Sequence, residues 1–90
     1  MRYIFRAHAL RRMIERDIDQ RCIKQVIEQG EIIEEYPDDH PYPSSLMMGW
    51  CGDRPVHVVC AKAKEVIFVI TVYEPDRAMW EKGFTQRKKV

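Results

Sequence analysis

Cysteine is scarce in this chain of 90 residues, and its thiols form no recognisable motif. Cys22, Cys51 and Cys60 are odd in number, and no two of them have the spacing of a CxxC pair. This pattern argues against a disulfide framework and against a zinc ribbon. It favours three buried thiols in a reducing compartment, so we expect a cytoplasmic protein.

Long apolar runs and ligand-binding motifs are also missing. No run approaches the roughly 20 apolar residues that span a bilayer, and the first residues do not have the apolar core of a signal peptide. The four glycines form no phosphate-binding loop, and the three histidines are scattered, with no HExxH motif. We therefore expect no membrane contact, no cofactor and no metal site.

Apolar and charged side chains make up most of the chain. A hydrophobic fraction of 46% predicts one ordered domain over residues 1–90. The net charge of +1 conceals a segregation of charge along the chain. Residues 1–24 hold seven bases and three acids, residues 28–39 hold six acids and no base, and residues 77–89 hold five bases and one acid. If the two basic ends meet in space, their arginines can bind phosphate.

Helical patterns occupy the first third of the chain. Residues 2–6 fit either an edge strand or the approach to a helix, and residues 7–15 then predict a first helix. A second helix is predicted to follow Asp19 as its N-cap and to end before Gly30. Asp76 is predicted to begin a short C-terminal helix.

Extended patterns fill the remainder and predict an antiparallel sheet of about four strands, with a tight turn at Gly52 and Asp53. The predicted strands are residues 32–36, 46–50, 55–61 and 66–73. The sequence therefore predicts an α+β fold of two layers, with two N-terminal helices packed on this sheet.

Burial also predicts the register of the two most apolar strands. Pairing His57 with Thr71 puts His57, Thr71 and Tyr73 on one face, and the preceding turn puts Met48 opposite His57. The other face then holds only apolar side chains, which are Val56, Val58, Cys60, Phe68, Ile70 and Val72.

A column of basic residues is predicted on the first helix. His8, Arg12 and Arg16 recur at every fourth position, with Arg11 beside them, so they share one face. One interpretation is a solvated face whose arginines pair with nearby acids. The other is a surface that binds an anion or transfers a proton.

Five residues of the predicted helix and strands would together suit the cleavage of RNA: His8, Arg12, His57, Thr71 and Tyr73. The 2′-hydroxyl of RNA can attack the adjacent phosphate, so the protein needs only a base, an acid and a cation near the phosphate. Imidazole and phenol suit the first two roles, and guanidinium suits the third. For His57 the competing interpretation is a hydrogen-bonded residue of the core.

Motifs over nearly the whole chain carry a resemblance to a known family. They are His8-Ala9-x-x-Arg12-Met13-x-x-Arg16-x-Ile18, Gly30, Ile33–Tyr36, Tyr42-Pro43, Gly49, Arg54-Pro55-x-His57-Val58-Val59, Ile70-Thr71-x-Tyr73, Pro75-Asp76 and Trp80. This pattern resembles the domain-of-unknown-function family numbered 4258. The chain departs from that pattern at Asp17, where many members have glycine.

The resemblance implies a RelE-like toxin of a type II toxin–antitoxin module, a hydrolase that cleaves mRNA without a metal. The implied catalytic residues are His8, Arg12, His57 and Tyr73. The implied RNA-binding residues are Arg11, Arg16, Thr71 and Arg87. The implied partners are RNA, free or on the ribosome, and an antitoxin of the zinc-finger or helix-turn-helix type. The alternative is a non-enzymatic protein-interaction module that uses the same basic face.

Overall fold

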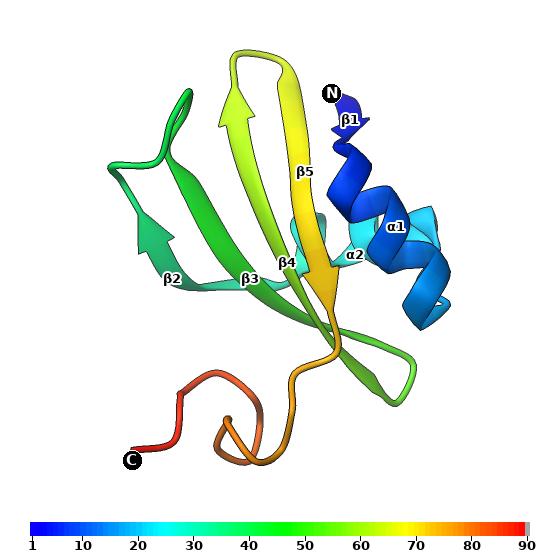
Figure 1. The fold of residues 1–90 in the computed structure, drawn as a ribbon, viewed down its shortest axis with the longest axis vertical. Helices are drawn as coiled ribbons and strands as arrows, with labels where there is room; N and C mark the ends of the chain where they lie inside the picture. Colours follow the sequence, from blue (N-terminus) through cyan, green and yellow to red (C-terminus); the bar gives the residue numbers. More distant parts are fainter. Residues whose placement is uncertain (90) are drawn as a thin grey trace.

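The sheet of this protein is mixed and has five strands (Figure 1). The structure is a computed structural model and describes residues 1–89. Its elements are β1 (Arg2–Phe5), α1 (Ala7–Arg16), α2 (Gln20–Gln29), β2 (Glu31–Tyr36), β3 (Ser44–Cys51), β4 (Arg54–Ala63) and β5 (Val66–Tyr73). The strand order is β1-β5-β4-β3-β2, with β1 parallel to β5 and every other pair antiparallel.

The predicted fold class is therefore wrong, and the RelE-like arrangement is corrected in three features. The sheet is not a purely antiparallel sheet of four strands, because β1 joins it beside β5. The helices do not pack as a pair on the sheet: α1 packs mainly against β5, whereas α2 packs against β3 and β4. The described chain after β5 contains no helix.

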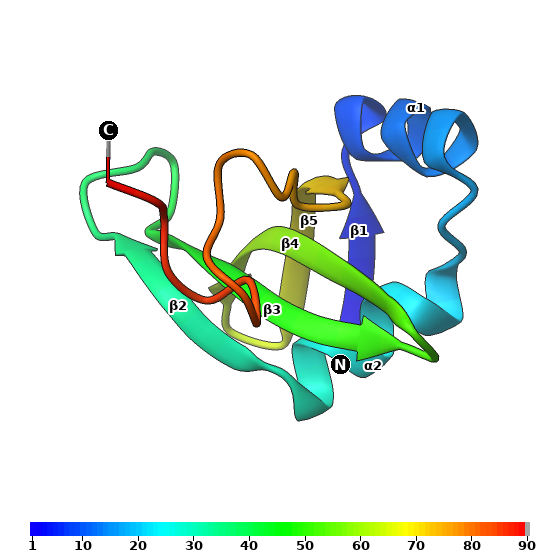
Figure 2. The same ribbon diagram turned by 90° about the horizontal axis from the view of Figure 1, so that it is seen from below.

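Residues 75–89, which we call the strap, replace the predicted C-terminal helix. Asp76 does cap a turn, since its carboxylate accepts a hydrogen bond from the Ala78 N–H at 2.8 Å. The turn extends only to Trp80, whose N–H donates to the Asp76 carbonyl oxygen at 3.1 Å. Farther on, the positive φ of Gly83 and Phe84, at 92° and 61°, excludes a helix. In Figure 2 the strap runs along β3 and β2, away from α1.

Both predicted caps of α2 are confirmed. The Asp19 carboxylate accepts a hydrogen bond from the Cys22 N–H at 2.9 Å, and Gly30 is the C-cap. Gly30 has a negative φ, so the left-handed conformation is not what requires glycine here. A Cβ atom at this position would overlap the carbonyl oxygen of Met48, so the close approach of α2 to β3 requires the missing side chain.

Two apolar clusters cover the two faces of the sheet. The first lies between the helices and the sheet, and it includes Ile23 and Val26 of α2. The second lies under the strap, where Trp80 and Phe84 pack against strand residues such as Leu46. Both faces of β3 and β4 are therefore buried, which agrees with their nearly continuous apolar sequence.

The predicted turn and the pairing of His57 with Met48 are confirmed, but the register of β4 with β5 is shifted. His57 pairs with Tyr73 instead of Thr71, and a bulge interrupts the ladder beyond Val59. The bulge inserts one extra residue, Ile70, and so exchanges the faces of the residues that precede it in β5.

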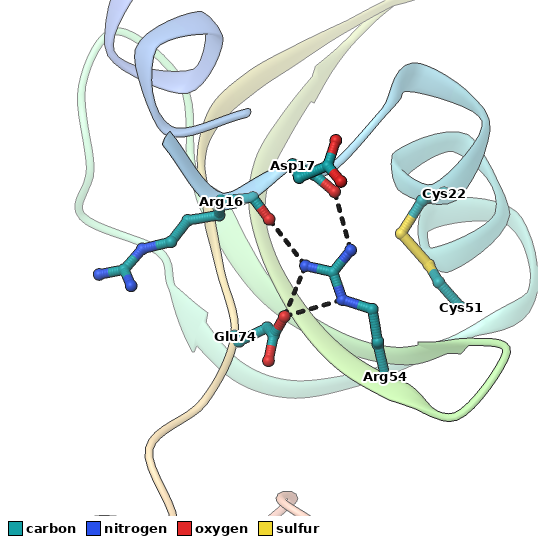
Figure 3. Close-up of polar contacts among 6 residues, drawn as sticks. All are labelled: Arg16, Asp17, Cys22, Cys51, Arg54 and Glu74. Carbon is teal, nitrogen blue, oxygen red and sulfur yellow. Dashed lines mark hydrogen bonds and ion pairs between the residues drawn. A yellow bond between two sulfur atoms is a disulfide. The ribbon is translucent and has the colours of Figure 1, made fainter. Parts of the chain in front are cut away.

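Arg54 ties the end of α1 to the sheet (Figure 3). Its guanidinium donates hydrogen bonds to the carbonyl oxygens of Arg16 at 2.7 Å and Asp17 at 2.8 Å, and to the Glu74 carboxylate at 2.8 Å. Asp17 adopts the left-handed conformation, with φ of 54°, which explains why glycine suits this position. The guanidinium thus satisfies carbonyl groups that the end of a helix leaves unpaired.

A disulfide joins Cys22 at the start of α2 to Cys51 at the end of β3, with a Cα–Cα distance of 5.6 Å (Figure 3). The prediction of three free thiols is therefore wrong, and only Cys60 is free and buried. The two cysteines are 29 positions apart, and they meet because α2 packs across β3. Sequence spacing alone gave no sign of this contact.

Candidate functional site

His57 is fully buried beneath the strap. Its Nε2 lies 2.8 Å from the carbonyl oxygen of Phe84, which can only accept, so Nε2 donates this hydrogen bond. Its Nδ1 lies 3.2 Å from the Tyr73 hydroxyl, and the ring of Trp80 lies perpendicular to the imidazole with centroids 4.5 Å apart. Burial lowers the pKa of His57, so the neutral form is favoured. In this arrangement His57 fastens the strap to the sheet.

Arg87 is held in an ion pair within the chain. Its guanidinium donates to the Glu34 carboxylate at 2.7 Å and 3.1 Å, and lies 4.7 Å from the Trp80 ring centroid. The hydrogen bond from Arg87 lowers the pKa of Glu34. Burial, and then the hydrogen bond to Glu34, raises the pKa of Tyr36 to about 12. These contacts hold the strap against β2. They also engage the Arg87 guanidinium, which the family resemblance implied for RNA binding.

The basic column on α1 is exposed, and most of it lies away from His57. Arg11 and Arg16 are exposed, and the Arg12 guanidinium lies 3.6 Å from the Glu15 carboxylate. His8, in the first turn of α1, is exposed and lines a hollow on the sheet. Of the predicted catalytic residues, Tyr73 therefore lies beside His57 under the strap, whereas His8 lies at this separate hollow.

The hollow beside His8 is a groove of about 480 Å³ between the start of α1 and the loop before β3. We call it the Phe68 groove. It lies on the same face of the sheet as the strap, because Ala61 alternates with Val59 and His57 along β4. Its polar and aromatic lining consists of Arg6, His8, Asp39, His40, Tyr42 and Phe68.

Aromatic rings and a cation are stacked at the centre of the Phe68 groove. The rings of Tyr42 and Phe68 are nearly parallel, with centroids 5.7 Å apart and an interplanar angle of 12°. The Arg6 guanidinium lies 4.9 Å from the Phe68 ring centroid. Tyr42 is 41% exposed, so the groove offers a ring to a ligand. Arg6 forms no ion pair within residues 1–89, so its charge is available.

The loop that closes the groove is held at its base. The Ser44 hydroxyl donates a hydrogen bond to the Asp39 carboxylate at 2.5 Å, and the His40–Pro41 peptide bond is cis. His40 directly follows Asp39, which this hydrogen bond holds in place. It lines the same groove as His8. Two imidazole groups and a guanidinium thus line one groove together with a stacked pair of rings.

Sequence reasoning missed four groove residues, namely Arg6, His40, Tyr42 and Phe68. Phe68 was assigned to the apolar face because the bulge was not predicted. His40 was considered only as a metal ligand, although a histidine and a tyrosine in one short loop were visible in the sequence. Among residues 1–89 there is no cluster of three side chains that could hold a metal ion. No helix in that range is long and apolar enough to cross a membrane.

The fold and the groove define a small α+β protein with a cationic, aromatic groove on a mixed sheet. Comparison with protein families identifies the family to which the chain belongs. Residues 5–74 match the domain of unknown function DUF4258, so the chain belongs to this family, as its motifs predicted. No curated protein and no solved structure matches the chain.

Proposed function

We propose that this protein is a toxin of the endoribonuclease kind, which binds single-stranded RNA in the Phe68 groove and cleaves it without a metal. The observation that supports the proposal is that Arg6, His8 and His40 line one groove with the stacked rings of Tyr42 and Phe68. These are the side chains that single-stranded RNA and its cleavage both need.

Stacking and charge support the binding step. Unpaired bases stack on aromatic side chains, and each such contact contributes about 1–3 kcal/mol. The exposed Tyr42 ring supplies this surface, and the guanidinium of Arg6 lies close enough to bind the adjoining phosphate. A narrow groove with one cation fits a single strand of RNA better than the regular backbone of a duplex.

Two imidazole groups support the cleavage step. One takes the proton of the 2′-hydroxyl as its oxygen forms a bond to phosphorus, and the other gives a proton to the 5′-oxygen as the P–O5′ bond breaks. The products are a 2′,3′-cyclic phosphate and a 5′-hydroxyl. His8 keeps its predicted role, and His40 takes the role predicted for His57, which is engaged with the strap.

A toxin of this kind would act in the cytoplasm on RNA, free or on the ribosome, and would be silenced by an antitoxin protein of the zinc-finger or helix-turn-helix type. A reducing cytoplasm would keep Cys22 and Cys51 as thiols, so the protein would be active without their disulfide. The test is therefore run with and without a reductant.

The experiment incubates purified protein with a single-stranded oligoribonucleotide in the presence of EDTA and identifies product ends by mass spectrometry. We expect 2′,3′-cyclic ends, and cleavage about 100-fold slower or more in His8→Ala and in His40→Ala. The control is Arg21→Ala, an exposed residue of α2 that lies outside the groove, and it should cleave normally. RNA that is neither bound nor cut by the unaltered protein would refute the proposal.

A second candidate function is the non-enzymatic interaction module. Leu10 and Ile14 lie one helical turn apart on α1 and are 44% and 83% exposed, which is unusual for large apolar side chains on a basic helix. Sedimentation of the unaltered protein and of Ile14→Asp at several salt concentrations tests it. A monomer under all conditions, together with active cleavage of RNA, would count against this candidate.

A further inference from the structure

Two adjoining hollows meet at the side chain of Trp50, at the opposite end of β4 from the Phe68 groove. One has a volume of about 300 Å³ and the other about 630 Å³, and both are lined by Trp50 and Gly83. The two hollows share these residues at their boundary, and we call the pair the Trp50 trough. It lies between α2, the start of β2 and the strap, and the RNA groove does not extend into it.

The centre of the trough is aromatic. The Trp50 side chain is 47% exposed, and its ring meets the ring of Phe84 edge to face, with centroids 6.0 Å apart. Phe84 and Trp80 are themselves buried and form the floor. A large exposed ring over a rigid apolar floor is the kind of site in which a partner buries one anchoring side chain.

The two ends of the trough differ in charge. At the strap end stand Arg77, Lys82 and Lys88 with one acid, Glu81, and none of the four forms an ion pair within residues 1–89. The Arg77 guanidinium lies 5.9 Å from the Phe84 ring centroid. The strap end can therefore bind a negatively charged group next to an apolar site.

At the α2 end the lining is mostly neutral and polar. It includes the amides of Gln25 and Gln29 and the carboxylate of Glu31. The Gln25 amide donates a hydrogen bond to the carbonyl oxygen of Trp50 at 3.2 Å, which holds it beside the anchoring ring. Amide groups pair well with a peptide backbone, whereas the Glu31 carboxylate repels phosphate.

We propose that the Trp50 trough docks an extended segment of a partner protein, in which a bulky apolar residue is followed by acidic residues. The apolar side chain would lie on Trp50 and Phe84, the carboxylates would meet Lys82 and Lys88, and the backbone would meet the glutamine amides. RNA fits less well, because the α2 end of the trough offers amides and the Glu31 carboxylate but no lysine or arginine for a phosphate. This proposal stands independently of RNA cleavage.

The experiment is a selection of random displayed peptides on the unaltered protein, with Trp50→Ala as the counter-selection target. We expect enriched peptides to place a large aromatic or aliphatic residue before a run of aspartate or glutamate. A fluorescein-labelled peptide with that consensus should bind the Trp50→Ala variant about 10-fold more weakly or worse. Lys82→Glu with Lys88→Glu should weaken it as well, with a stronger effect at low salt.

The matched control is Met79→Ala, which removes an exposed apolar side chain of the strap outside the trough and should bind like the unaltered protein. Far-ultraviolet circular dichroism and urea unfolding, which do not depend on the Trp50 ring, check that each variant is folded. The proposal is overturned if no peptides depend on Trp50, or if the enriched peptides are basic. It is also overturned if Trp50→Ala weakens binding of a single-stranded oligoribonucleotide, because the trough would then belong to an RNA surface.

Discussion

At the scale of single residues, the three histidines show how environment decides role. His57 lies in an apolar strand and is completely covered, with both ring nitrogens in contact with polar groups of the chain. His8 and His40 lie at the start of a helix and in a loop, and both are exposed at the groove. Only the exposed pair can reach a substrate without the strap moving, so the proposed proton transfer rests on that pair.

The burial of His57 makes the stability of the protein depend on pH. Burial lowers the pKa of His57 below its ordinary value near 6.5, while the Glu34 carboxylate opposes this shift and Arg87 adds to it. Below about pH 6.5 the unfolded chain therefore takes up a proton that the folded chain does not. We expect the free energy of unfolding to fall as the pH drops from 7.5 to 5.5, by up to about 1.4 kcal/mol per pH unit.

Urea unfolding of the unaltered protein and of His57→Gln checks this expectation. A glutamine can still donate to the Phe84 carbonyl but does not titrate, and His8 and His40 remain in both proteins. The variant should lose less stability over this pH range than the unaltered protein. Equal losses in the two proteins would show that other groups are responsible.

At the scale of elements, the sequence correctly predicted the features that depend on a few neighbouring residues. The caps of α2, the turn between β3 and β4 and the pairing of Met48 with His57 follow from short stretches of sequence. The bulge in β5 does not, because its extra residue, Ile70, looks like any other apolar strand residue. Missing it placed Phe68 on the wrong face and concealed the groove. The parallel pairing of β1 was equally invisible, because it depends on a strand more than sixty positions away.

The link between α2 and β3 carries a second prediction. Replacing Cys22 and Cys51 with serine frees a loop closed over 29 positions, which should reduce the free energy of unfolding by about 3–4 kcal/mol in the chain-entropy model. Urea unfolding of the unaltered protein should show a similar loss when a reductant is added, whereas the double-serine variant should not respond to it. Thiol titration of the unreduced protein should find one free thiol, that of Cys60. Three free thiols would show that the bond is not formed.

At the scale of the whole molecule, charge is divided between opposite sides. The basic helix α1 lies beside β5 (Figure 1), while the strap packs against β3 and β2 (Figure 2). The two basic ends of the chain therefore do not form one surface. Between them, residues 25–53 contain no lysine or arginine. The condition under which the two ends would cooperate in binding RNA is therefore not met, and the proposed RNA binding rests on a small local site.

This division of charge predicts a weak dependence of RNA binding on salt. If Arg6 is the main phosphate contact, one or two phosphates are neutralised, and the logarithm of the association constant should fall with the logarithm of salt with a slope of about −1. Arg6→Ala should reduce the slope by about 0.7, and Arg11→Ala, on the exposed face of α1, should leave it unchanged. Fluorescence polarisation of a labelled oligoribonucleotide at several salt concentrations measures the slope for the unaltered protein and for each of the two variants. A steep slope that falls equally in both variants would mean that RNA lies along the whole of α1, and the Phe68 groove would then be only its end.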